Sequence, residues 1–176
     1  MKQVSSLWQW TGFGAATLGG TILHFLYDWT GGSIWTAPFS GVNESTWEHM
    51  KLLFWPLFLF AVVQRLFFRE HENFWCVKLL GILLGLALIP VLFYTYNGAI
   101  GKSPDWLNIA IFYICAGAVF LFERWAFQNL HGSGRMGFAV ICLVGVLFVV
   151  FTFAPPRVPL FQDPITGSYG IKNAAG

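Results

Sequence analysis

The sequence predicts an all-α integral membrane protein, a bundle of five transmembrane helices with an ordered non-helical C-terminal tail. Three observations support this prediction: 56% of the 176 residues are hydrophobic, only 10% are charged, and the mean hydropathy is +0.63. Soluble domains carry about 25% charged residues, so this chain has too few charges to cover a fold in water. Its 9 Trp and 19 Phe residues suit a bilayer, where Trp favours the interface.

Five segments are long and apolar enough to be spans, since a helix needs about 20 apolar residues to cross the hydrocarbon core. Gly-, Pro- and Asn-rich connections at 30–42 and 97–104 favour antiparallel packing of neighbouring helices. We therefore expect one transmembrane domain over residues 1–176. Its predicted spans are 7–27, 46–68, 73–96, 106–127 and 136–154, and its tail is 155–176.

The first span, 7–27, places Gly12, Ala16 and Gly20 four residues apart, a spacing that lets another helix approach closely. The same face continues to His24 and Asp28. Polar side chains at such depth usually face the bundle interior and mark functional sites. We therefore expect His24 and Asp28 to point inward.

The second span, 46–68, follows the motif Asn-Glu-Ser-Thr-Trp-Glu-His-Met-Lys over residues 43–51. Ser45 and Glu48 have the spacing of a capping box, in which both side chains satisfy free backbone N–H groups. Asn43 has an equally ordinary reading as a turn residue. A structural and a functional role for Glu48 are evenly matched.

Three charges near these helix ends are unfavourably placed when each is taken alone. Asp28 lies at the negative end of the first helix, whereas His49 and Lys51 lie at the positive end of the second. We expect the 29–44 loop to bring them together, so that Asp28 neutralises Lys51 or orients His49.

Two imidazoles with carboxylates are a sufficient ligand set for zinc or another divalent metal, with a position left for water. The spacing is not diagnostic, and a metal-free proton relay or structural ion pairing remains open. The candidate metal ligands are His24, Asp28 and His49. The candidate catalytic residues, a general base and an anion-stabilising cation, are Glu48, Glu44 and Lys51.

The third span, 73–96, contains Pro90, which frees a backbone carbonyl and favours a cavity nearby, as Pro56 does in the second span. Polar and aromatic residues near this face are candidates for substrate binding, although the tyrosines also suit an aromatic belt. The candidate substrate-binding residues are Asn43, Trp47, Tyr94 and Asn97.

The fourth and fifth spans, 106–127 and 136–154, carry few polar residues. We expect Glu123 and Arg124 to be interfacial anchors whose charged ends reach water. The three cysteines lie inside apolar runs without paired spacing, so we expect small buried hydrophobes rather than disulfides. They are Cys76, Cys115 and Cys142.

The tail from residue 155 onward is too rich in Pro and Gly for a helix, yet too apolar for a free end. We expect an ordered lid, folded back over the site by turns at Asp163-Pro164 and Thr166-Gly167. A disordered tail is the alternative.

The number and distribution of charged residues exclude nucleic acid as a partner and predict the orientation in the membrane. The net charge of +2 is scattered, which excludes a nucleic-acid surface and leaves membrane lipid and a small lipid-like ligand as expected partners. Six Lys and Arg residues lie on the N-terminal side and four on the other. This bias predicts a multi-pass protein of the cell membrane with a cytoplasmic N-terminus and an outward C-terminus.

Three segments together resemble the motifs of an uncharacterised family of small bacterial multi-pass membrane proteins, a domain of unknown function. They are His-x3-Asp-Trp at 24–29, the motif at 43–51, and Asp-Pro-Ile-Thr-Gly-Ser-Tyr-Gly-Ile at 163–171. The resemblance covers nearly the whole chain and implies no activity.

The residues themselves favour a metal-dependent hydrolase of a lipid-like substrate, with zinc as the expected metal. A proton- or cation-coupled transporter or sensor, and a structural membrane subunit without catalysis, are the alternatives.

Overall fold

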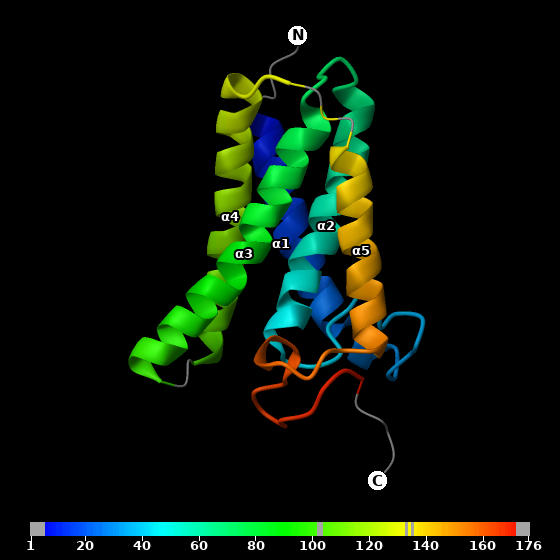
Figure 1. Ribbon diagram of the computed structural model, residues 1–176, viewed down its shortest axis with the longest axis vertical. Helices are drawn as coiled ribbons and strands as arrows, with labels where there is room; N and C mark the ends of the chain where they lie inside the picture. The colour runs from blue at the N-terminus through cyan, green and yellow to red at the C-terminus, as the bar shows by residue number, and fades with distance from the viewer. Residues whose placement is uncertain (1–5, 102–103, 133, 135, 172–176) are drawn as a thin grey trace.

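The computed structural model describes residues 6–101, 104–132, 134 and 136–171. Within these residues the regular structure is helical, apart from one isolated bridge between Gln162 and Tyr169. Successive helices run in opposite directions along the long axis (Figure 1), and the predicted all-α class is confirmed. They are α1 (Ser6–Trp29), α2 (Thr46–Phe67), α3 (Phe74–Ile100), α4 (Asp105–Asn129) and α5 (Gly137–Phe153), followed by the 3-10 turn η1 (Pro159–Phe161).

The five helices match the five predicted spans, and the largest difference is at the end of α3. This helix continues past residue 96 to Ile100, and within its last turns Asn97 donates a side-chain hydrogen bond to the Phe93 carbonyl at 2.8 Å. Some residues of the charge count and of the predicted tail lie outside the described part of the chain. They are Lys2, Lys102, Arg135 and Lys172 of the charge count, and residues 172–176 of the predicted tail.

The apolar helices indicate a membrane location. Among the described residues, α2, α3 and the Trp106–Asn129 part of α4 are long and apolar enough to cross a membrane. Helix α5 is apolar and has 17 residues, about 25 Å of helix against a hydrocarbon core of about 30 Å. Large apolar side chains such as Leu18, Leu59 and Leu121 are exposed on the outer surface, where lipid would cover them.

The core lies between α2, α3, α4 and α5, and α1 packs onto it through its small residues. Ala16 is fully buried, and a methyl group at Gly12 would overlap the rings of Phe60 and Phe120. At Gly20 it would overlap Phe112 and press on the backbone of α2. The predicted close approach along this face of α1 is confirmed.

A buried ion pair joins α3 to α4 near the end of the bundle where α1 begins. Lys78 Nζ lies 2.5 Å from Glu123 Oε2, and both side chains are 2% exposed or less. The expectation that Glu123 is an interfacial anchor is therefore wrong. The ammonium group also lies 5.6 to 5.9 Å from the ring centres of four phenylalanines, which adds cation–π attraction. These rings belong to Phe60, Phe74, Phe120 and Phe127.

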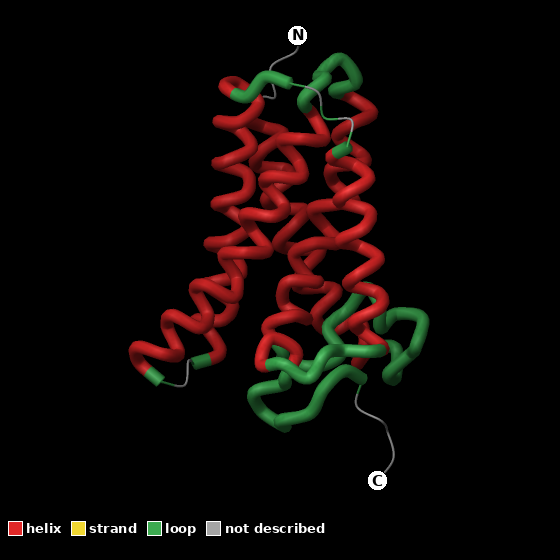
Figure 2. The backbone as a smooth tube through the Cα atoms, viewed as in Figure 1, coloured by secondary structure: helices red, strands yellow, loops and turns green. Residues whose placement is uncertain are grey.

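The described part of the tail, residues 155–171, is ordered and mostly non-helical, as predicted. Asp163 organises its turn: the backbone N–H groups of Ile165 and Thr166 donate to its carboxylate, and that of Gly167 donates to its carbonyl. Gly167 has a φ of +71°, which a side chain would disfavour. The tail and the 30–45 loop lie together at the end where α1 and α5 finish and α2 begins (Figure 2). At this end, α3 and α4 lean away from α2 (Figure 1).

Candidate functional site

Three side chains from separate segments converge beneath the tail, and we call them the His–Glu cluster: His24, Glu44 and His49. His24 Nε2 lies 3.8 Å from Glu44 Oε1, and His49 Nε2 lies 3.6 Å from Glu44 Oε2. One ligand atom from each residue lies within 4.8 Å of both others. Among the described residues this is the one group of three or more His, Cys, Asp or Glu side chains close enough to share a metal ion.

The loop after α1 is shaped so that Glu44 lies between the two histidines. Gly31 and Gly32 have φ angles of +65° and +76°, and their N–H groups donate back to the last carbonyls of α1. This C-terminal cap needs left-handed residues, which glycine supplies without strain. The loop then returns to α1, where Gly41 N–H donates to the Leu23 carbonyl at 3.2 Å. Glu44 follows three residues after Gly41, close to the end of α1.

The first turn of α2 orients His49. Ser45 is the N-cap residue, and its hydroxyl accepts from the Glu48 N–H at 3.4 Å. Its carbonyl lies 2.9 Å from His49 Nδ1. Because a carbonyl can only accept, Nδ1 carries a hydrogen, and Nε2 faces Glu44, as a lone pair when the ring is neutral. A backbone carbonyl behind a histidine is a common arrangement at metal sites, since it fixes the tautomer and the ring orientation.

The cluster has the chemistry and approximate spacing of a divalent-metal site. Zinc binds His nitrogen and Glu oxygen at about 2.0–2.2 Å, so two such donors in a tetrahedral shell lie about 3.3 Å apart. The observed nitrogen–oxygen separations are 3.8 and 3.6 Å. In the neutral ring, a cation between Nε2 and the Glu44 carboxylate would join two acceptors, whereas in the imidazolium the Nε2–H group would pair with Glu44 directly. Two His and one Glu also form the ligand set of known catalytic zinc sites, which keep a fourth position open.

Asp28, predicted as a ligand, lies near the cluster but is not one of its three members. Asp28 is exposed one turn after His24, and it lines the same cavity as His24 and Glu44. The expected pairing of Asp28 with Lys51 is replaced by an ion pair between Lys51 and Glu48. His49 is oriented by the Ser45 carbonyl instead. The reason is proximity, because residues three apart on a helix are neighbours.

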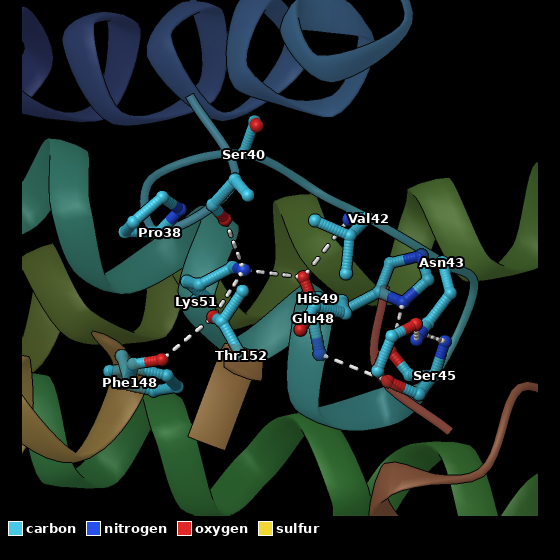
Figure 3. A network of polar contacts seen from close by, with 12 residues as sticks. Pro38, Ser40, Val42, Asn43, Ser45, Glu48, His49, Lys51, Phe148 and Thr152 are labelled. Carbon is cyan, nitrogen blue, oxygen red and sulfur yellow. Dashed lines mark hydrogen bonds and ion pairs between the residues drawn. The ribbon is translucent and has the colours of Figure 1, made fainter. Parts of the chain in front are cut away.

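Glu48 and Lys51, predicted as catalytic residues, form a buried network (Figure 3). Lys51 Nζ lies 2.6 Å from Glu48 Oε2 and donates to the Ala37 carbonyl and the Thr152 hydroxyl, each at 2.9 Å. These contacts occupy all three N–H groups of the ammonium. The Glu48 carboxylate also accepts from the Val42 N–H at 3.1 Å. The network thus ties the loop that carries Glu44 to α2 and α5.

The predicted capping box is half formed as a result. Ser45 caps the helix as expected, but Glu48 reaches Val42 rather than the Ser45 N–H. Asn43 Oδ1 accepts from that N–H at 2.8 Å, and Asn43 Nδ2 donates to the Gly170 carbonyl at 2.9 Å. Asn43 therefore holds the tail against the start of α2.

Three cavities meet at the cluster. The α1–α4 cavity, of about 460 Å³, has His24, Phe25, Ile109, Phe112 and Tyr113 among its walls. The α3–α4 cavity, of about 280 Å³, has Thr46, Phe93, Asn97, Asn108 and Phe112 among its walls. The loop cavity, of about 630 Å³, has Tyr27, Asp28, Gly32, Asn43 and Ile171 among its walls. Glu44 lines all three.

The remaining substrate-binding candidates fall in different places. Asn97 lines the α3–α4 cavity, whereas Tyr94 is exposed on α3 and lines none of the three cavities. Trp47 packs at a tilt against Phe148 and against Phe161 of the tail, with ring centres 4.5 and 4.6 Å apart. Trp47 therefore anchors the tail.

Several residues at the site had no clear signal in the sequence. Asn108 and Ile165 each line both the α1–α4 and the α3–α4 cavity. Thr152 is a buried hydroxyl that accepts from Lys51. A polar residue inside a long apolar span was the only available hint for Asn108 and Thr152. For Ile165 there was none, because its position depends on how the tail folds.

Residues 1–171 match DUF6512, a family of unknown function. No curated protein and no solved structure matches the chain.

Proposed function

The chain belongs to DUF6512, a family of unknown function, and we propose from its site that it is a membrane-embedded, metal-dependent hydrolase. One observation carries this proposal: two imidazole nitrogens and one carboxylate oxygen, from three separate segments, lie within 4.8 Å of one another. His24, Glu44 and His49 would hold the ion, which supplies Lewis-acid chemistry to a carbonyl or phosphoryl oxygen. Zinc is the metal that this ligand set fits best.

The loop cavity offers a route for water and a proton acceptor. Asp28 lines this cavity beside His24 and Glu44 and is exposed, so its carboxylate suits a general base. In the reaction, the water oxygen bonds to the electrophilic centre and the bond to the leaving oxygen or nitrogen breaks. The proton that Asp28 removes from water passes to the leaving group.

The distribution of basic residues supports an orientation for this site. A cytoplasmic N-terminus places the end of α1, the start of α2 and the tail on the outer side of the cell membrane. The cluster would then lie at the outer interface, where water and lipid are both within reach.

Metal analysis of the purified protein tests the proposal. We expect about one zinc per chain after purification without chelators, and loss of at least about tenfold in affinity when ligands are removed. The test variant is His24→Ala/His49→Ala. The matched control is His131→Ala, an exposed histidine outside the cluster. Wild-type protein that neither retains zinc nor binds added zinc would refute the proposal.

Proton- or cation-coupled transport is the second candidate, and one feature of the other half of the bundle favours it. Gln64 is fully buried with both side-chain polar atoms unpaired in the described structure, and the Lys78–Glu123 pair is buried too. Buried polar groups of this kind mark ion pathways in many transporters. Proton flux in proteoliposomes that is lost in Gln64→Leu, with zinc content unchanged, would favour transport over hydrolysis.

A further inference from the structure

We infer that the substrate is a membrane amphiphile, an acyl ester or amide with an uncharged head group. Its chain would enter sideways from the bilayer through the α1–α4 cavity. This inference rests on the proposed hydrolase function and adds the substrate class. It is argued from two cavities, one mainly apolar and one more polar, that both reach the His–Glu cluster.

The α1–α4 cavity suits an apolar chain. Its volume of about 460 Å³ lies within the range of about 300–1,000 Å³ that is usual for ligand sites. Phe25, Ile109 and Tyr113, which form part of its wall, are 45, 59 and 41% exposed on the outer surface of the bundle. The cavity therefore opens where lipid would surround the protein. A chain can enter from there without crossing water.

The same cavity leads from the outer surface to the reactive cluster. On α1 its wall runs from Gly20 to His24, about 6 Å along the helix axis. Phe112 can lie against α1 because Gly20 has no side chain, and it forms the partition shared with the α3–α4 cavity. A chain in this cavity would place its polar end at His24 and His49.

The α3–α4 cavity suits the head group. Thr46, Asn97 and Asn108 bring one hydroxyl and two carboxamides to its wall, which makes this wall more polar than that of the α1–α4 cavity, although one Asn97 N–H group already donates to the Phe93 carbonyl. Pro164 and Ile165 of the tail also line it, and Ile165 reaches the α1–α4 cavity as well. The tail therefore lies where the acyl chain and the head group of a bound amphiphile would join.

Charge narrows the class of head group. No Lys or Arg is among the described residues that line either cavity, and Lys51 is buried in its own network. Phosphate groups are usually bound by Arg, Lys or clustered N–H donors. Hydroxylated neutral head groups, such as glycerol, match the donors and acceptors that are present.

Photolabelling tests the inference directly. The probe is a monoacylglycerol with a diazirine in its acyl chain, added to the full-length zinc-loaded protein in phosphatidylcholine vesicles. We expect the label on the α4 peptide that contains Ile109 and Phe112. Thr21→Phe, which fills the α1–α4 cavity, should reduce this labelling about tenfold. Unlabelled monoacylglycerol should compete for the site, and phosphatidylglycerol should not.

Matched variants separate a filled cavity from a damaged fold. Ile22→Phe adds the same ring to the neighbouring residue, which is 52% exposed and lines none of the three cavities, and should label like wild type. If Thr21→Phe does not fold, Ile109→Trp replaces it, with the lipid-facing Ile114→Trp as its control. Labelling spread evenly over all helices, or unchanged by the filling variant, would overturn the inference.

The zinc content of the same samples distinguishes the two proposals. Zinc-loaded protein without cavity-specific labelling would overturn the amphiphile inference and leave the metal site intact. Cavity-specific labelling in protein that never binds zinc would support the amphiphile site and refute the hydrolase.

Discussion

Replacement of Lys51 by Met is the most informative test of how the loop over the cluster is held. The ammonium is fully buried and contacts Glu48, the Ala37 carbonyl and the Thr152 hydroxyl at 2.6, 2.9 and 2.9 Å. Met keeps the length of the side chain and removes the charge. Glu48, with its side chain 3% exposed, would be left as a buried carboxylate with the Val42 N–H as its remaining hydrogen-bond donor.

The expected loss follows from that uncompensated charge. Removing one partner of a buried ion pair costs about 3–5 kcal/mol, a large share of a total stability of about 5–15 kcal/mol. Lys51→Met/Glu48→Gln removes both charges and keeps an acceptor for Val42. It should therefore be more stable than Lys51→Met alone, with a coupling energy of about 0.5–3 kcal/mol.

Unfolding in detergent, followed by tryptophan fluorescence, measures both effects. The control is Arg69→Met, an exposed cation outside the network, which should change stability by less than about 0.5 kcal/mol. The reasoning is refuted if Lys51→Met is as stable as wild type, or if the double variant is less stable than Lys51→Met. Zinc affinity should fall in parallel, because the same network holds the loop that carries Glu44.

Two further predictions concern packing away from the cluster. Gly12→Ala should lower the free energy of unfolding by about 1–3 kcal/mol, because its methyl group would overlap Phe60 and Phe120. Gly14→Ala, where nothing lies within 4 Å of the new methyl group, should raise it by about 0.5–1 kcal/mol. Equal unfolding free energies for the two variants would contradict this prediction. Glu123→Gln leaves Lys78 buried without an anion and should cost about 3–5 kcal/mol in the same assay; a loss below about 1 kcal/mol would show that the phenylalanine rings suffice.

The sequence predicted where the site lies more closely than it predicted which charged side chains pair there. The prediction that His24 and His49 meet rested on a helical face and a short loop, and their ring centres lie 6.0 Å apart. The partner of Lys51 was missed because the helix-dipole argument treats each charge separately. Glu48 is on the same face of α2 and is the nearer carboxylate. Glu44, expected as a base, is instead the carboxylate that both histidines face.

Composition and periodicity alone determined that this chain is a bundle of five apolar helices, because the free energy of burying apolar side chains depends mainly on their number and spacing. They also predicted that His24, Asp28, Glu44 and His49 lie at one end of the bundle. Tertiary structure decided which charges pair, that Lys78 and Glu123 are buried, and that Ile165 lines two of the cavities at the cluster. Those outcomes depend on the directions of loops and side chains over a few ångströms, and residue spacing along the chain does not specify them.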